Sequence, residues 1–289
     1  MFLYLKFLRP YQWVKNFLIF IPILSSHQIN EVSLKNSILA FISFCFISSA
    51  GYIINDIFDY NSDKDHPHKK ERPFASGKVK KYEAVILTIS LFALALITSF
   101  LYLNIEFLFT ILIYFLLTSI YTLYLKQINI LDIITLSGFF TLRIYGGSQA
   151  TDISISMWLL AFSVFFFFSL AAVKRQAEIV NSLKIKKINI VGRGYNVNDI
   201  KLITLVALIS GYISIIVLAF YIKSNEVIKL YTNPNFLLGC CVVLIYWISR
   251  IVYVTNKGFM HYDPIIYAFT DKQSYVCLML ILFLVTVSV

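Results

Sequence analysis

The chain has 289 residues, of which 59% are hydrophobic, 17% aromatic and 14% charged, and its mean hydropathy is +0.77. A soluble domain carries roughly 45–50% apolar and about 25% charged residues, and a disordered chain needs low hydrophobicity, so both classes are excluded. The four cysteines lie in apolar runs without metal-binding spacing, which argues against a disulfide scaffold and a cysteine metal site.

Nine stretches predict membrane-spanning helices, because a span needs about 20 predominantly apolar residues. They cover residues 11–27, 34–55, 83–103, 105–125, 131–150, 154–173, 202–222, 235–255 and 273–289. The first is interrupted by polar residues and a proline. No small-residue cleavage site follows it, so we expect an anchor and not a removed signal peptide. The predicted fold is all-α, a polytopic membrane helical bundle forming one domain over residues 1–289.

The basic residues predict the orientation of this bundle. With nine spans, one side of the membrane collects 21 of the 25 lysines and arginines and the other side three, while Arg143 lies inside a span. The positive-inside rule makes the first side cytoplasmic, in an integral protein of the cytoplasmic (inner) membrane. It also explains the net charge of +10 without nucleic acid. The two long polar loops, 56–82 and 174–201, both lie on this side, so we expect the chemistry there.

Acidic residues cluster where the second predicted span ends. If that helix continues beyond the membrane, Asn55, Asp59 and Asp63 stack on one face at one-turn spacing, with Asp56 beside them. Like charges at this spacing repel one another unless a cation neutralises them. Magnesium favours one or two carboxylates completed by waters and substrate phosphates, so we expect Asn55, Asp59 and Asp63 to bind Mg²⁺. The alternative is a solvated loop whose acids cap a helix.

Basic residues follow these acids within a few turns. Lys69 and Arg72 carry ammonium and guanidinium groups, which suit phosphate oxygens. Acids for a metal beside bases for an anion predict a metal–diphosphate site. His66 and His68 have no further histidine at zinc-binding spacing, so we interpret them as loop residues able to contact substrate and not as metal ligands.

The acidic segment also carries a family resemblance. The pattern Asn-Asp-x-x-Asp-x-x-x-Asp resembles the first aspartate-rich motif of the UbiA superfamily of intramembrane prenyltransferases, and nine helices with polar loops after the second and sixth extend the resemblance over the whole chain. Aromatic prenyltransferases of that family continue with Arg-Thr-x-x-Arg-Pro. This chain instead resembles the polyprenyl-phosphate phosphoribosyltransferase branch, with His66-Pro67-x-Lys69-x-x-Arg72-Pro73-x-Ala75-Ser76-Gly77.

The resemblance assigns roles to further residues. The opening segment, residues 9–16, is similar to the start of the same branch, which implies that Lys15 and Asn16 hold a phosphate. Read without the resemblance, Lys15 is a topology signal. The resemblance also implies that Lys126 contacts phosphate and that Asp132 contacts sugar or metal. Arg143, inside a span, is expected in an internal polar cavity, where it binds substrate phosphate or pairs with backbone carbonyls and a tyrosine.

The end of the sixth span departs from the general family pattern. Members with two aspartate motifs carry the second one here, whereas this chain has Lys174-Arg175-x-x-Glu178, as the phosphoribosyltransferase branch does. Two cations in place of acids indicate that these residues bind anionic substrate oxygens directly. The alternative is a charged helix end closed by a salt bridge.

Together these features predict a Mg²⁺-dependent membrane glycosyltransferase. By resemblance, it moves 5-phosphoribose from phosphoribosyl diphosphate to a polyprenyl phosphate and releases diphosphate. Asp59 and Asp63, with Asn55 and Asp56, form the predicted catalytic centre. One alternative is a UbiA-type aromatic prenyltransferase that uses a prenyl diphosphate. A transporter is disfavoured, because nearly every acid lies at the cytoplasmic rim and not along a path at membrane depth.

Overall fold

A computed structural model describes residues 2–64, 69–184, 192–260 and 263–289. Every regular element in these ranges is a helix, so the all-α prediction is confirmed. The helices are α1 (Phe2–Leu8), η1 (Pro10–Phe20), α2 (Ile21–Ser25), α3 (Glu31–Phe58), α4 (Tyr60–Lys64), η2 (Lys69–Glu71), α5 (Lys81–Tyr102), α6 (Ile105–Leu123), η3 (Leu125–Gln127), α7 (Leu131–Thr151), α8 (Met157–Lys184), η4 (Val197–Asp199), α9 (Ile200–Ile222), α10 (Asn225–Leu230), η5 (Pro234–Phe236), α11 (Leu237–Asn256), α12 (Pro264–Ala268) and α13 (Lys272–Ser288).

Six helical stretches in the described ranges are long and apolar enough to cross a membrane, and they coincide with six of the nine predicted spans. They are Glu31–Phe58, Lys81–Tyr102, Ile105–Leu123, Met157–Lys184, Val197–Ile222 and Pro234–Asn256. The predicted span 131–150 is the helix α7, which carries more polar residues. The predicted span 273–289 is the 17-residue α13, and 11–27 is largely the 3-10 helix η1. The count of nine spans stays a prediction.

Backbone contacts divide the chain into two compact units. Unit 1 comprises Met1–Ile128 and Leu142–Ser154, and unit 2 comprises Asn129–Thr141 and Ile155–Val289. The helix α7 therefore contributes its first part to unit 2 and its second part to unit 1. The single domain expected from the sequence stays a prediction.

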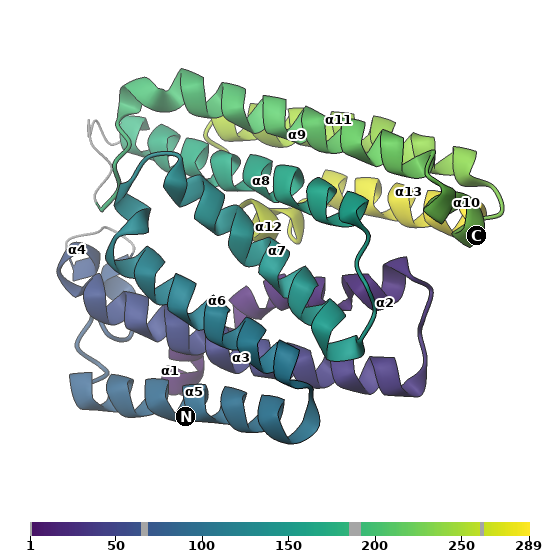
Figure 1. The fold of residues 1–289 in the computed structure, drawn as a ribbon. Helices are drawn as coiled ribbons and strands as arrows, with labels where there is room; N and C mark the ends of the chain where they lie inside the picture. Colours follow the sequence, from purple (N-terminus) through teal and green to yellow (C-terminus); the bar gives the residue numbers. More distant parts are fainter. Residues whose placement is uncertain (1, 65–68, 185–191, 261–262) are drawn as a thin grey trace. The chain divides into compact units, whose positions relative to one another are not determined.

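In unit 1, α3 is the central helix and packs against α5, α6 and η1 (Figure 1). It buries a face rich in serine and alanine, with Gly51 among them, and small residues let helix backbones approach closely. A Cβ on Gly51 would lie 2.8 Å from the methyl group of Thr118 in α6. Asn30 caps the helix by accepting from the amide of Ser33 at 2.9 Å. This packing holds the far end of α3, which carries the acids, in a defined place.

The segment η1 lies against α7 within unit 1. The carbonyl of Ile19 lies so close to Gly147 that a Cβ atom on residue 147 would overlap the carbonyl oxygen. Pro10 begins η1, where its missing N–H costs no helical hydrogen bond. The contact explains how an 11-residue 3-10 helix, which rarely persists alone, is held in place by the backbone of a neighbour.

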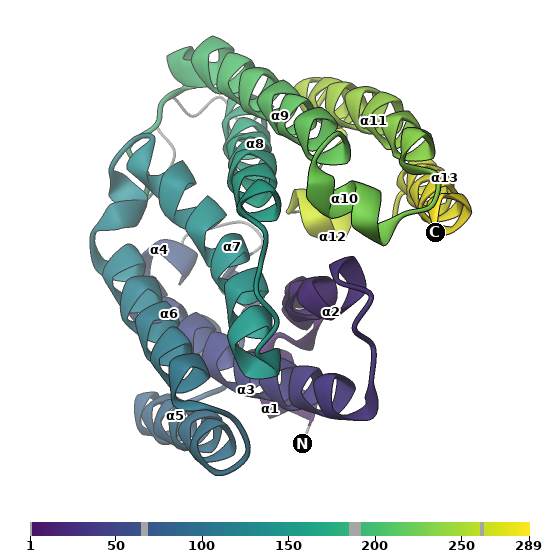
Figure 2. The ribbon, with the colours of Figure 1, turned by 45° about the vertical axis from the view of Figure 1, so that its right-hand side comes forward.

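In unit 2, α8 packs along α9, α9 along α11, and α11 along α13 (Figure 2). Contacts among Arg250, Asp271 and Ser274, which we call the latch, hold the start of α13 against α11. Arg250 of α11 donates to both carboxylate oxygens of Asp271 at 2.7 and 2.9 Å, and Asp271 caps α13 by accepting from the amide and hydroxyl of Ser274, each at 2.8 Å. Trp247 donates to the same serine hydroxyl at 3.0 Å. The latch fixes the start of α13 and the short α12 before it.

Candidate active site

Three aspartates gather at the end of α3 in unit 1. Asp56 lies in the last turn of α3, Asp59 ends the helix, and Asp63 lies on α4. The amide of Asp59 donates to the carbonyl of Asn55 at 2.9 Å, and that of Asp63 to the carbonyl of Asp59 at 2.8 Å. The one-turn spacing therefore continues across the break between α3 and α4. Nδ2 of Asn55 also donates to Oδ2 of Asp59 at 3.0 Å, so these two predicted ligands lie together.

Two arginines hold the two buried aspartates. The side chains of Asp56 and Asp63 are each 2% exposed. Nη1 of Arg72 lies 3.3 Å from Oδ1 of Asp56 and 2.5 Å from Oδ2 of Asp63, so one guanidinium bridges both carboxylates. Arg9 forms a second ion pair with Asp56. Burying a carboxylate without a partner is costly, so the arginines allow this helix end to hold like charges.

Arg9 is a member of the cluster to which the sequence assigned no role. Its backbone is left-handed, with φ 54° and ψ 57°, and its guanidinium lies 5.5 Å from the centre of the Tyr52 ring. Burial lowers the pKa of Arg9, but the neighbouring carboxylate of Asp56 outweighs this and raises the pKa above its ordinary value. Its position directly before Pro10, in the segment similar to the branch opening, was the only available signal.

Asp59 is the most accessible of the three acids, with 24% of its side chain exposed. Lys126, on η3, is almost buried and forms an ion pair with it. Nζ of the half-exposed Lys69 lies 3.9 Å from Oδ1 of Asp63. The cations predicted to bind phosphate thus lie within ion-pair distance of the acids predicted to bind metal.

The donor set can be tested for magnesium. In the parts of the chain that the structure describes, no three His, Cys, Asp or Glu side chains converge as a metal cluster. The acids instead hold basic groups. Asn55, Asp59 and Asp63 still present amide and carboxylate oxygens at one-turn spacing, and Mg²⁺ needs only one or two carboxylates when phosphates and waters complete its shell. The residues therefore fit Mg²⁺ in chemistry. His66 and His68 lie outside the described residues.

A second polar group in unit 1 is buried among the helices. Nε of Arg143 donates to Oδ1 of Asn16 at 2.8 Å, and Nη2 donates to the hydroxyl of Tyr114 at 2.7 Å. Asn16 donates in turn to Sγ of Cys45 at 3.3 Å. Arg143 is 2% exposed and Lys15 is 6% exposed. The tyrosine contact expected for Arg143 is present, and Asn16, expected to hold a phosphate, is engaged by this arginine.

Unit 2 holds a separate charged cluster. Arg175 of α8 donates through Nη2 to Oδ1 of Asp132 at 3.0 Å, pairs through Nε with Oδ2 of the same carboxylate, and forms an ion pair with Glu178. The side chains of Arg175 and Asp132 are both fully buried, whereas that of Glu178 is 33% exposed. A guanidinium fork against a carboxylate is the strong, geometrically specific form of the ion pair.

Arg193 is a further cation of this cluster that sequence reasoning missed. Its Nη1 lies 3.6 Å from Oδ1 of Asp132 and its Nε 3.9 Å from Oε2 of Glu178. Two residues later, the buried Tyr195 accepts a hydrogen bond through its hydroxyl from the amide of Ile130, at 2.7 Å. Arg193 lies between Gly192 and Gly194, and no local sequence pattern indicates its partners, which come from other segments.

Lys174 has a different partner from its neighbour. Its Nζ lies 3.2 Å from Oδ2 of Asp263, which also caps α12 by accepting from the amide of Ile265 at 3.2 Å. Glu178 pairs with Arg175 and Arg193, as described above. Of the predicted substrate-binding residues in unit 2, Asp132, Arg175 and Glu178 are thus brought into one network, and Lys174 is joined to the last connection of the chain.

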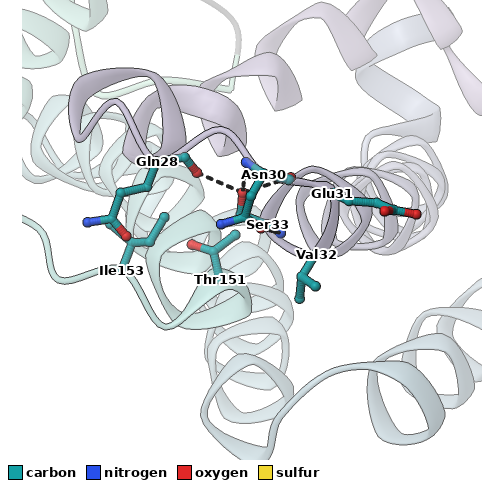
Figure 3. A pocket seen from close by; sticks show the side chains of 7 residues that line it. All are labelled: Gln28, Asn30, Glu31, Val32, Ser33, Thr151 and Ile153. Atoms are coloured by element: carbon teal, nitrogen blue, oxygen red, sulfur yellow. Dashed lines mark hydrogen bonds between the residues drawn. The ribbon is translucent and has the colours of Figure 1, made fainter.

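A pocket of about 490 Å³ in unit 1 contains none of the predicted site residues (Figure 3). It is lined by Gln28, Asn30, Glu31, Val32, Ser33, Thr151 and Ile153. Figure 3 shows these side chains around the start of α3, where Ser33 donates to the carbonyl of Gln28 at 2.7 Å. The acids occupy the other end of this 28-residue helix, about 40 Å away at 1.5 Å per residue. The pocket is therefore not part of the charged cluster.

Comparison with known proteins gives a consistent picture. The family model for the UbiA prenyltransferase family matches residues 17–257. The chain is 34% identical over 279 residues to the nodulation protein NoeC of Azorhizobium caulinodans, covering 96% of this chain and 90% of that protein. It is also 34% identical over 180 residues to the decaprenyl-phosphate phosphoribosyltransferase of Corynebacterium glutamicum, an alignment that covers 61% of this chain and 54% of that enzyme.

Solved structures share the fold. The structure of a UbiA homologue from Archaeoglobus fulgidus bound to GPP and Mg²⁺ superposes with a TM-score of 0.73 at 17% identity, covering 98% of this chain and 99% of that one. The fold neighbour confirms the polytopic helical architecture. The resemblance to the phosphoribosyltransferase branch is confirmed as sequence similarity over part of the chain.

Proposed function

Because this chain belongs to the UbiA prenyltransferase family, we propose that it is a transferase that moves 5-phosphoribose from phosphoribosyl diphosphate to a polyprenyl phosphate, releasing diphosphate. The chain is an integral membrane protein with apolar helices, which suits an acceptor carrying an isoprenoid tail. We also propose the inner membrane as its location, with the loops 56–82 and 174–201 on the cytoplasmic side. The partial similarity to decaprenyl-phosphate phosphoribosyltransferases supports the choice of substrates.

One observation carries the choice of reaction. In unit 2, at the position where family members with two aspartate motifs carry further acids, Lys174 pairs with Asp263 and the buried Arg175 pairs with Asp132. The partly exposed Arg193 lies beside the same Asp132. Such a network offers cations for phosphate and carboxylates that accept hydrogen bonds from sugar hydroxyls. A prenyl diphosphate has no hydroxyl groups outside its diphosphate, so it would make no hydrogen bonds to these carboxylates. A phosphorylated sugar uses both kinds of group.

In unit 1, the acids and their basic partners have complementary tasks. Asn55, Asp59 and Asp63 would hold Mg²⁺, with Asp56 kept in place by Arg9 and Arg72. When bound, Mg²⁺ neutralises negative charge that develops on a departing diphosphate. Arg72, Lys69 and Lys126, which pair with these acids in the structure, then turn to phosphate oxygens and stabilise the same charge.

The charge balance of this cluster supports the proposal that its cations turn from the aspartates to the phosphate oxygens. Three aspartates face four cations, namely Arg9, Lys69, Arg72 and Lys126, so the group carries one net positive charge. A bound divalent cation raises the net charge of the group to three positive charges. This is equal in size and opposite in sign to the charge of a fully ionised diphosphate ester. The acceptor phosphate loses its second proton near pH 6, so at neutral pH it is a nucleophile without a general base. This agrees with a cluster that contains acids and permanent cations.

The experiment follows label into lipid. Purified full-length protein in detergent is incubated with Mg²⁺, phosphoribosyl diphosphate labelled in its 5-phosphate, and a polyprenyl phosphate, and the lipid is extracted. We expect label in the organic phase in proportion to the diphosphate released. Chelation with EDTA abolishes the transfer and Mg²⁺ restores it. Label that stays wholly aqueous at saturating substrates overturns the proposal.

A parallel reaction tests the aromatic prenyltransferase alternative. The same preparation receives a labelled prenyl diphosphate and an aromatic acceptor. Prenylated arene with no transfer of phosphoribose would replace the proposed activity by this alternative. An Asp63→Asn variant serves as the common negative control, because both reactions use the acids of unit 1.

A further inference from the structure

Two arginines in unit 2 contact the same pair of acids in different ways. Arg175 is fully buried and engages Asp132 through two of its nitrogens and Glu178 through the third. Arg193 is 19% exposed, and its nitrogens lie 3.6 and 3.9 Å from those carboxylates, beyond ordinary hydrogen-bond length. The two cations therefore share acids but differ in what else they can reach.

Burial decides which of them can serve a ligand. Arg175 cannot reach a substrate without leaving the buried Asp132 uncompensated, and uncovering a buried charge is strongly unfavourable. The contacts of Arg193 with Asp132 and Glu178 are long and partly solvated, and such contacts contribute little. The guanidinium of Arg193 can turn to a phosphate, whose oxygens match the fork of donors, while Glu178, already a third exposed, is solvated by water.

The backbone around Arg193 is nevertheless anchored. Tyr195 ties this segment to Ile130, directly before the helix that carries Asp132. The next residue, Asn196, donates from its amide to Asp199 at 2.9 Å and accepts from the amide of Asn198 at 2.9 Å, which closes the turn into α9. A fixed backbone with a partly exposed guanidinium is the arrangement expected of a ligand-binding residue, because little order is lost on binding.

We infer that Arg193 binds a phosphate monoester of the substrate and that Arg175 is a positioning residue that keeps Asp132 and Glu178 in place. This rests on the proposed function, whose two substrates both carry that group. One is the 5-phosphate of phosphoribosyl diphosphate and the other is the phosphate of the polyprenyl acceptor. The chemistry is the same in both cases, so the experiment separates the two sources.

The binding test needs no turnover. Thermal unfolding of wild type, Arg193→Gln, Arg193→Lys and Lys201→Gln is followed with two probes, ribose 5-phosphate and farnesyl phosphate. Lys201 is an exposed cation on α9, so its variant removes the same charge outside the cluster. We expect one probe to stabilise wild type and Lys201→Gln alike. The affinity of Arg193→Gln for that probe falls about 10-fold or more, as for the loss of a charged hydrogen bond, with Arg193→Lys between.

The kinetic test uses the same variants. Arg193→Gln raises KM for the substrate whose phosphate it binds, with kcat within about threefold of wild type, as expected for an interaction made equally in ground and transition states. If the source is the 5-phosphate, the variant and wild type perform alike with ribosyl diphosphate that lacks this group. If the source is the lipid, KM rises for the polyprenyl phosphate instead. Either pattern supports the inference.

The opposite results are equally clear. Equal stabilisation of wild type and Arg193→Gln by both probes, or no stabilisation of wild type by either, overturns the inference. So does an Arg193→Gln enzyme with both KM values within twofold of wild type. A wild-type protein that binds a probe through Arg193 but transfers no label overturns the proposed reaction and leaves the phosphate site standing.

Discussion

The two charged clusters are built from the same residue types in opposite arrangements. In unit 1, the three acids follow one another along α3 and α4, and their four cations come from three separate segments. In unit 2, two cations are neighbours on α8, and their acids, Asp132, Glu178 and Asp263, come from different segments. Consecutive acids repel one another, so the first cluster depends on cations from outside its helix. In the second cluster, Arg193 adds a third cation, so three acids and three cations balance in charge.

Within each cluster, the two arginines differ in how deeply they are buried. In both clusters the more buried arginine pairs closely with a buried carboxylate, as Arg9 does with Asp56 and Arg175 with Asp132. The more exposed arginine, Arg72 or Arg193, also contacts two acids but can reach a ligand from its partly exposed position. We expect the more buried arginine of each cluster to determine stability and the more exposed arginine to determine substrate affinity.

Substitution of the acids of unit 1 is expected to reduce turnover more than any other change. Asp59→Asn and Asp63→Asn each remove a carboxylate expected to hold the metal, so turnover falls about 10³-fold or more, measured as lipid-extractable label. Membrane yield stays at the wild-type level, because asparagine keeps the shape of the side chain. The matched control is Glu71→Gln, an exposed acid of η2, which keeps full activity. Substantial turnover by Asp63→Asn would contradict the metal role.

The next effect separates the arginines of unit 2. Arg175→Gln leaves the buried Asp132 without its guanidinium fork, and breaking a buried pair costs about 3–5 kcal/mol. We therefore expect a lower unfolding temperature in detergent, and a lower yield, for Arg175→Gln. Arg193→Gln, with its longer contacts, unfolds within a few degrees of wild type. Equal destabilisation by the two substitutions would show that burial does not distinguish them.

The same contrast in unit 1 is expected to be smaller. Arg9→Gln removes one of two cations on Asp56, and Arg72 remains, so the loss is about 2 kcal/mol. Arg72→Gln, by contrast, raises KM for the diphosphate substrate, and it also lowers stability because Arg72 is the close partner of the buried Asp63. Unfolding curves and steady-state kinetics on both variants check the pair. A kinetic defect in Arg9→Gln larger than that in Arg72→Gln would reverse the assignment.

The smallest effect concerns the latch of unit 2 and its pH dependence. Burial raises the pKa of Asp271, but hydrogen bonds from Arg250 and Ser274 outweigh this and hold the pKa below its ordinary value. The carboxylate therefore stabilises the protein above its unfolded pKa of about 3.9, and this contribution is lost as pH falls through the lower folded value. Tyr267, which donates to the same carboxylate at 3.3 Å, stays protonated throughout this range.

Asp271→Asn is thus expected to be about 1–2 kcal/mol less stable than wild type at pH 7, with the difference shrinking below about pH 4. Unfolding temperatures measured across pH 3–7 test this. Turnover at pH 7 stays near the wild-type value, because the latch lies outside the charged network. A stability difference that does not change with pH would mean that the carboxylate charge plays no part in the latch.

The sequence predicts local relations well and distant ones poorly. The stacking of Asn55 and Asp59 follows from helical spacing, and their side chains meet at 3.0 Å. The apolar runs identify the long helices for the same reason. Arg9 and Asp56 are 47 positions apart, so their ion pair depends on how η1 returns to α3, which no local pattern encodes.

Some residues were identified without their partners. Arg143 is recognisable as a charge inside an apolar run, but only the fold shows that Asn16 and Tyr114 receive its hydrogen bonds. For Arg175, complete burial depends on α7 and could not be inferred from a charged helix end. Arg193 carried no signal, because a basic residue between two glycines is typical of any turn.

The contact between Gly147 and Ile19 limits which substitutions the chain can tolerate at position 147. Every missense change of a glycine codon adds a Cβ, and at this position a Cβ would overlap the carbonyl oxygen of Ile19. Saturation mutagenesis should therefore recover only synonymous codons at position 147, whereas the nearby Gly138, with no atom in the space of its Cβ, should accept alanine. The N-terminal segment that brings Arg9 to Asp56 thus depends on a glycine codon more than 120 positions downstream, at which we expect no amino-acid substitution to be tolerated.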